Sequence, residues 1–310
     1  MSEISYDVIV FFGFLPITIG FWLLWLNFSF VWHALFDGEK SNFLSGFDLI
    51  ISGFREKHQE LLNEDHSLQI QSIWAYLFFR VSLQVLGLPI LALGVLGSLR
   101  NDSAVFVVVM AGAGILGVII ELEQRNMLLE GSYGGSFALY DLMALIVIGG
   151  ILMIENSFEI VKLVNINWLT STTHAFLRMI LIILVLYFIS RSSSYLGQKK
   201  PAAYEKSTPL TTSLPKVLER GIQGSQGLVQ VVIIVFLSVV LTSSFYYSIF
   251  GREPLFILKI LLGVVIFLYC ASITLFFSSI QNTRRRKRFS PGSVTAMLLA
   301  LMIEAILFFS

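Results

Sequence analysis

Charged side chains are scarce in this chain. Asp, Glu, Lys and Arg make up 13% of its 310 residues, whereas they make up roughly a quarter of ordinary soluble domains. Apolar residues make up 56% of the chain, and its mean hydropathy is +0.81. This composition excludes a water-soluble fold. The formal net charge of +1 gives no sign of general binding to polyanions, so we expect no nucleic-acid partner.

Cysteine is almost absent. Cys270 is the single cysteine and falls in an apolar segment, so the chain alone cannot form a disulfide, a thiolate metal cluster or a redox pair. The four histidines show no metal-ligand spacing such as HExxH. Walker, GxGxxG and GxSxG sequences are also missing. We therefore assign no catalytic residue, metal site or bound cofactor to this chain alone.

Eight long apolar segments dominate the chain instead. A hydrocarbon core about 30 Å thick requires ~20 helical residues, and backbone groups in lipid must be paired within the segment. The sequence therefore predicts an all-α, polytopic integral membrane protein that forms a single membrane domain over residues 1–310. The predicted transmembrane helices cover residues 8–36, 72–98, 104–121, 137–154, 174–190, 227–249, 254–280 and 291–309. Pro16 lies inside the first span and predicts a tilt or a kink there.

The distribution of Lys and Arg predicts the topology. Fifteen of the twenty-one basic residues fall in the loops after the first, third, fifth and seventh spans, and the other loops hold three. By the positive-inside rule, the odd-numbered loops face the cytoplasm of a plasma (inner) membrane, and both termini face the other side. One basic run is expected to fix this orientation and to contact lipid headgroups. It consists of Arg284, Arg285, Arg286, Lys287 and Arg288.

Two predicted cytoplasmic loops are long enough to carry structure. In residues 38–71, apolar side chains recur at helical spacing and charged residues follow them, which predicts a short amphipathic helix at the membrane surface. Residues 191–226 begin with a stretch rich in Ser, Pro, Lys and Thr that is typical of a flexible loop. The last part of this loop is expected to re-enter or cap the helix bundle.

A few ionisable residues lie at membrane depth. A charge near the bilayer centre costs about 2.5–3.5 kcal/mol on insertion scales, so such residues usually face protein or water and often serve transport. Glu121, Glu123 and Asp141 lie near the cytoplasmic boundary, where an ion-path role and a solvated interfacial role both remain open. Arg178 and Lys259 lie near the opposite ends of their spans, where snorkelling accounts for them. Arg80 is the remaining basic residue of this kind.

Glu304 differs because apolar residues surround it in the middle of the last span. It is expected to be protonated, to pair with a neighbour, or to belong to an ion path, and we favour a helix-contact or partner-subunit role over a proton relay. The segment AGAGILG contains Gly112 and Gly114, which are expected to permit close packing of helices. Polar residues in the spans are sparse and the two halves of the chain show no repeat, which argues against a conventional carrier.

Three stretches of the chain resemble one protein family. The first is GFDLIISGFREK at 46–57, which is similar to a surface-helix pattern with an early Asp and a closing basic and acidic pair. Asp48, Arg55 and Glu56 match that pattern. The second is EQRNMLLEGSYGGSFALYD at 123–141, which is similar to the stretch that leads from the third span into the fourth.

The third stretch is SLPKVLERGIQGSQG at 213–227, which is similar to an acidic loop before the sixth span, with Glu219 matching one of the acids. With eight spans and an amphipathic first loop, the chain resembles the subunit 1 family of respiratory complex I and the related membrane subunits of energy-converting hydrogenases. The resemblance implies a cofactor-free subunit that docks a soluble cytoplasmic module, hydrogenase-like or other, onto antiporter-like membrane subunits.

The resemblance also implies roles for particular residues. The candidates for coupling or for the ion path are Glu121, Glu123, Asp141 and Glu219, and Glu304 joins them because of its position in the middle of the last span. The candidates for docking and for the surface helix are Asp48, Arg55, Glu56, Tyr140 and Arg125.

The chain departs from the family where a quinone would bind. The Gln-x-Arg-x-Gly-Pro segment after the first span is absent, and Ile51 stands where the surface helix has a Lys. Ser213 and Gly224 stand where the fifth loop tends to have carboxylates. Quinone binding by the familiar route is therefore doubtful. Two other functions remain open, namely a free-standing ion or solute transporter and a membrane scaffold.

Overall fold

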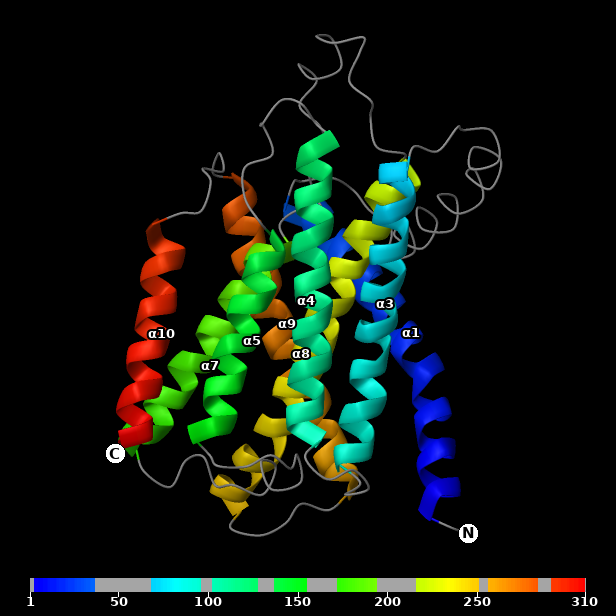
Figure 1. The fold of residues 1–310 in the computed structure, drawn as a ribbon. Helices are drawn as coiled ribbons and strands as arrows, with labels where there is room; N and C mark the ends of the chain where they lie inside the picture. The colour runs from blue at the N-terminus through cyan, green and yellow to red at the C-terminus, as the bar shows by residue number, and fades with distance from the viewer. Residues whose placement is uncertain are drawn as a thin grey trace.

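A computed structural model describes residues 3–36, 68–95, 102–127, 137–154, 172–193, 216–250, 256–283 and 291–309, and side chains near several helix ends lie outside the description. The described residues form eight α-helices and no strand (Figure 1). The predicted all-α fold is confirmed. The helices are α1 (Glu3–Phe36), α3 (Leu68–Val95), α4 (Asp102–Met127), α5 (Phe137–Ile154), α7 (Thr172–Ser193), α8 (Lys216–Phe250), α9 (Phe256–Thr283) and α10 (Pro291–Phe309).

Seven of these helices are long and apolar enough to cross a membrane. The eighth is α5, whose 18 residues span about 27 Å at 1.5 Å per residue, slightly less than a hydrocarbon core of about 30 Å. Eight segments are predicted to be long enough to cross a membrane. Seven of them meet this prediction, and α5 is slightly short. The chain is a membrane-embedded helical bundle, and both of its termini lie at the same end of the bundle (Figure 1).

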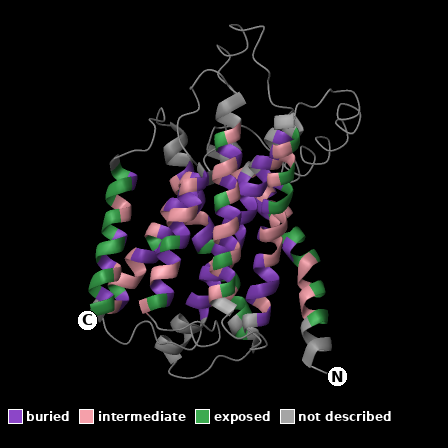
Figure 2. Ribbon diagram, viewed as in Figure 1, coloured by how far each residue is buried: buried purple, intermediate pink, exposed green. Residues whose placement is uncertain are grey.

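The helices are arranged around α8. Of its membrane-spanning segment, 89% is buried, whereas the corresponding shares for α1 and α10 are 11% and 22%. Figure 2 shows the buried residues gathered in the middle of the bundle and the exposed ones on the outer helices. The main core includes Phe106 of α4 and Phe236 of α8, whose rings stack with centroids 4.9 Å apart. The exposed side chains of α1 and α10 are mostly apolar, as lipid-facing helices require.

Helix α8 begins earlier than predicted. The prediction assigned residues up to 226 to a cytoplasmic loop, but the helix starts at Lys216. The reason is packing. Leu218 and Ile222 lie four residues apart on one face of the helix, and both are buried in a second apolar cluster with Ile73 and Leu77 of α3. The third stretch of the family resemblance is therefore mostly helical here, and the loop assignment is wrong for residues 216–226.

Close packing at the glycines of α4 is confirmed. A Cβ atom at Gly114 would lie 2.6 Å from Leu142 Cδ2 of α5, and one at Gly112 would lie 3.3 Å from Leu83 Cδ1 of α3. Leu142 could not keep its place beside a larger residue at position 114, and Leu83 would have to shift by a few tenths of an ångström beside one at position 112. The segment AGAGILG thus lets α4 fit between α3 and α5.

Helix α1 is attached to α8 by two tryptophans. The Trp22 indole N–H donates to the Gly224 carbonyl at 2.8 Å, and the Trp25 indole N–H donates to Gln230 Oε1 at 3.1 Å. A Cβ atom at Gly227 would lie 2.8 Å from Leu26 Cδ2. α1 is one continuous α-helix that includes Pro16. α1 is therefore in direct contact with the first half of α8.

Several predicted features lie outside the described residues. These are residues 38–67 of the segment predicted to hold the amphipathic helix, with Asp48, Arg55 and Glu56, residues 194–215 of the second long loop, and the basic run from Arg284 to Arg288.

Candidate functional site

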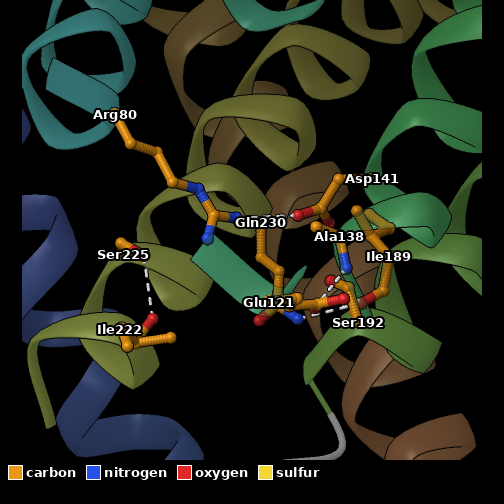
Figure 3. A network of polar contacts seen from close by, with 9 residues as sticks. All are labelled: Arg80, Glu121, Ala138, Asp141, Ile189, Ser192, Ile222, Ser225 and Gln230. Atoms are coloured by element: carbon orange, nitrogen blue, oxygen red, sulfur yellow. Dashed lines mark hydrogen bonds and ion pairs between the residues drawn. The ribbon is translucent and has the colours of Figure 1, made fainter. Parts of the chain in front are cut away.

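A buried ion pair joins α3 to α5. Arg80 Nη2 lies 3.1 Å from Asp141 Oδ2, and the two side chains are 1% and 0% exposed (Figure 3). Arg80 is also the largest fully buried side chain among the described residues. Because a buried charge is costly unless it is paired and hydrogen-bonded, each of these residues requires the other.

Two neighbours fix the position of the guanidinium group. Gln84 lies one turn after Arg80 on α3. With its amide oriented so that both atoms are paired, Gln84 accepts from Arg80 Nε at 3.1 Å and donates to the Ser225 carbonyl of α8 at 3.0 Å. On another side, Gly117 of α4 leaves room for the guanidinium, since a Cβ atom there would lie 2.8 Å from Arg80 Cζ. Arg80 therefore reaches Asp141 across the surface of α4.

A second carboxylate stands beside this pair. Glu121 of α4 is buried, and its Oε1 accepts a hydrogen bond from the backbone N–H of Ala138 at 2.7 Å (Figure 3). Ala138 is in the first turn of α5, where backbone N–H groups have no partner within the helix and where negative charge is stabilised. Glu121 thus caps the helix that carries Asp141. The cap and the ion pair depend on the same helix end.

Further polar groups extend the site towards α7 and α8. The Ser192 hydroxyl lies beside the Asp141 carboxylate and donates to the Ile189 carbonyl at 3.0 Å. Gln230 Nε2 of α8 donates to the same carbonyl at 2.9 Å (Figure 3). Gln230 Oε1 is the acceptor for Trp25 of α1. A line of buried polar groups therefore runs from α1 through α8, α7 and α5 to Arg80 on α3. Chains of buried hydrogen bonds strengthen one another in a low-dielectric interior.

The structure brings together some of the predicted site residues. Glu121 and Asp141 meet in this cluster, whereas Glu123 is partly exposed. Glu219 and Arg125 lie in α8 and α4, but their side chains are outside the described residues. Tyr140, a docking candidate, is buried, and its hydroxyl lies 3.2 Å from Ser293 Oγ of α10. It therefore joins two helices and does not present its side chain to a soluble partner.

Arg80 is a site residue that the sequence pattern does not predict. The pattern places it at membrane depth without a role. The partner of Asp141 is Arg80. A signal was available, because Arg80 and Gln84 are four residues apart and therefore share one face of an otherwise apolar helix.

Glu304 is separate from this cluster. It lies on α10, it is partly buried, and its carboxyl group occupies the space that a Cβ atom at Gly150 of α5 would need. Glu304 therefore lies at the contact between α10 and α5. Among the described residues, no three His, Cys, Asp or Glu side chains are placed to share a metal ion.

The cluster has the chemistry of a charge-responsive element. Two carboxylates and one guanidinium lie in a water-poor interior, where charge interactions are stronger than in water. Adding or removing one proton, or bringing up one external charge, would change which groups are paired. Comparison with protein-family models and with curated proteins finds no match to this chain.

Proposed function

We propose that this protein is a cofactor-free membrane subunit of an ion-translocating assembly of the complex I or energy-converting hydrogenase type. Its role would be to connect a soluble cytoplasmic module to antiporter-like partner subunits. The observation that carries the proposal is the buried Arg80–Asp141 pair with Glu121 beside it. The resemblance of residues 46–57, 123–141 and 213–227 to the subunit 1 family adds independent support.

The site supports coupling better than solute carriage. Its charged groups are buried, and Arg80 and Asp141 are paired with each other, whereas a carrier needs a water-accessible cavity near mid-depth with groups free to bind the solute. A pocket further along the bundle, between α5, α7 and α8, is lined by apolar side chains such as Ile148, Ile182 and Phe236. The polar groups are instead used to connect five helices. A site of this kind responds to charge and can pass a packing change between helices.

The proposed orientation follows from the basic residues. With the odd-numbered loops in the cytoplasm, the helix ends nearest the cluster, such as the start of α5 and the end of α4, face the side of the soluble module. A change in contact or charge at that surface would then occur close to Glu121 and Asp141.

Purification of the tagged full chain in mild detergent tests the proposal. We expect antiporter-like membrane subunits and a soluble module to co-purify with it, and we expect the chain alone to be poorly stable. A chain that purifies alone, remains folded and transports an ion or a solute after reconstitution would overturn the proposal.

A second test separates coupling from a structural role. The double variant Arg80→Gln/Asp141→Asn removes both charges of the ion pair together and leaves Glu121 with its hydrogen bond from the Ala138 N–H. If the pair takes part in coupling, the complex with the double variant should assemble but should translocate ions at least tenfold more slowly. Unchanged translocation in an assembled double variant would exclude the pair as a coupling element.

A further inference from the structure

One face of the bundle combines exposed apolar side chains with a carboxylate. We call it the α5–α10 face, and it consists of Ile146, Gly150 and Met153 of α5 and Leu301, Glu304 and Phe308 of α10. On each helix the three residues are spaced by three or four positions, so they lie on one side of that helix. The four large apolar residues are all exposed. Figure 1 shows α10 at the edge of the bundle next to α5.

Glu304 lies where the two helices meet. Its carboxyl group rests on Gly150, in the space that any larger residue would fill. Ala300, Ile303 and Leu307 form the buried stripe of α10, and Glu304 is at the edge of this stripe. The residues one turn before and after it, Leu301 and Phe308, project to the outer side.

Glu304 lies at a depth in the membrane where a carboxyl group without a partner is costly. The membrane-spanning part of α10 covers Gly292–Phe309, so Glu304 lies about 5 Å from its midpoint at 1.5 Å per residue. Its Oε1 atom is buried and accepts no hydrogen bond from any described part of the chain. Polar groups in hydrocarbon are stabilised by partners, and ionisable ones usually face protein or water. The chain on its own does not provide that partner within its described residues.

We propose that the α5–α10 face binds a transmembrane helix of a partner subunit that carries a Lys or Arg at the depth of Glu304. Charge complementarity selects this occupant, because lipid chains offer no donor to the carboxylate. The exposed side chains of Ile146, Met153, Leu301 and Phe308 would pack around the incoming helix. Gly150 would keep Glu304 at the junction of the three helices, where small residues permit close approach. The inference rests on the proposed function in requiring a partner membrane subunit.

Site-specific photocrosslinking in native membranes tests the surface. A photoreactive residue at Leu301 or Phe308 should form an adduct with one membrane protein, and mass spectrometry should place the crosslink in a transmembrane helix that contains Lys or Arg. Leu299 and Ile306 are matched controls, since they are exposed on the opposite side of α10 and should give no such adduct. Crosslinks from Leu301 and Phe308 only to lipid, or only to a second copy of this chain, would overturn the proposal.

Substitutions test the role of the carboxylate. Glu304→Lys should lower the amount of the crosslinked partner that co-purifies by at least fivefold, and a Lys→Glu or Arg→Glu change in the partner should restore it. Gly150→Ala should also weaken retention because it displaces the Glu304 carboxyl group. Gly149→Ala is the control, since a Cβ atom there meets nothing within 4 Å. Full retention of the partner in both Glu304→Lys and Gly150→Ala would overturn the proposal.

The outcomes also separate this inference from the proposed function. If a basic transmembrane helix crosslinks to the α5–α10 face but belongs to no ion-translocating assembly, the docking surface stands and the proposed function fails. If the ion-translocating assembly purifies intact and positions 301 and 308 give no partner adduct, the proposed function stands and the docking surface fails.

Discussion

Gly117 makes room for Arg80. A Cβ atom at position 117 would lie 2.8 Å from Arg80 Cζ and 3.0 Å from Nη1, so the guanidinium group is in contact with the backbone of α4. Ala138 of α5 closes the same space from the other side, 2.9 Å from that Cβ position. The ion pair between α3 and α5 therefore depends on α4, which provides no charge to the pair but leaves room for it at Gly117.

Gly117→Ala should destabilise the bundle. The added methyl group must displace Arg80 or Ala138, and overpacking of this kind typically costs about 1–3 kcal/mol. Thermal unfolding in detergent, followed by a thiol-reactive dye on buried Cys270, should report a lower midpoint. Gly20→Ala is the control, because a Cβ atom at Gly20 meets nothing within 4 Å. Equal midpoints for the two variants would contradict the packing described for Arg80.

The single and double variants of the ion pair should be strongly non-additive. Arg80→Gln or Asp141→Asn alone leaves one buried charge without its partner, which costs about 3–5 kcal/mol in comparable pairs. The double variant removes both charges, so it should be more stable than at least one of the single variants. A double-mutant cycle of unfolding free energies measures this coupling. Additive losses would mean that the two side chains do not depend on each other.

Much of the fold could be predicted from the sequence, because a bilayer requires long apolar helices and such segments are visible without any tertiary information. The start of α8 could not be placed in this way. Residues 213–227 are rich in Ser, Gly, Gln and charge, which is typical of a loop, and only their contact with Ile73 and Leu77 accounts for the helix. The same limit applied to the site. Arg80 and Asp141 are 61 residues apart in the chain, and their meeting depends on how α4 packs between them.

Accessibility labelling should confirm the predicted orientation. Cys270 is buried, so single cysteines introduced elsewhere can be labelled against a low background. Cysteine at position 45 or 207 should react with a membrane-impermeant reagent only from the cytoplasmic side, and cysteine at position 165 only from the other side. The reason is the excess of Lys and Arg in the odd-numbered loops. Labelling of positions 45 and 207 only from outside would reverse the topology.

Quinone binding between α1 and α8 should be weak or missing. Trp22, Trp25 and Leu26 pack directly on the glycine-containing first part of α8, and both indole groups are hydrogen-bonded there. A photoreactive quinone analogue added to the purified assembly should therefore leave these three residues unlabelled, even at saturating concentration. The control is a known quinone-binding membrane protein treated in parallel. Specific labelling of Trp22 or Trp25 that excess quinone suppresses would contradict the prediction.

Glu121 offers a way to separate helix capping from charge. Its Oε1 accepts the Ala138 N–H at 2.7 Å, and Gln can provide the same acceptor without the negative charge. Glu121→Gln should therefore lower the free energy of unfolding by only about 1 kcal/mol, because it keeps a neutral hydrogen bond (about 0.5–1.5 kcal/mol) in place of a charge-assisted one (about 1.5–3 kcal/mol). Glu121→Leu loses both the acceptor and the charge and should be less stable than Glu121→Gln.

If the charge of Glu121 takes part in coupling, the Glu121→Gln complex should assemble normally but translocate ions at least tenfold more slowly, as measured in reconstituted vesicles. Glu123→Gln is the matched control on the same helix, since Glu123 is partly exposed and solvent can screen its charge. It should translocate ions at close to the parent rate. Normal translocation by Glu121→Gln would leave Glu121 with a capping role alone. Equal losses in the two variants would instead indicate that the net charge of this helix end matters and that burial beside Arg80 does not.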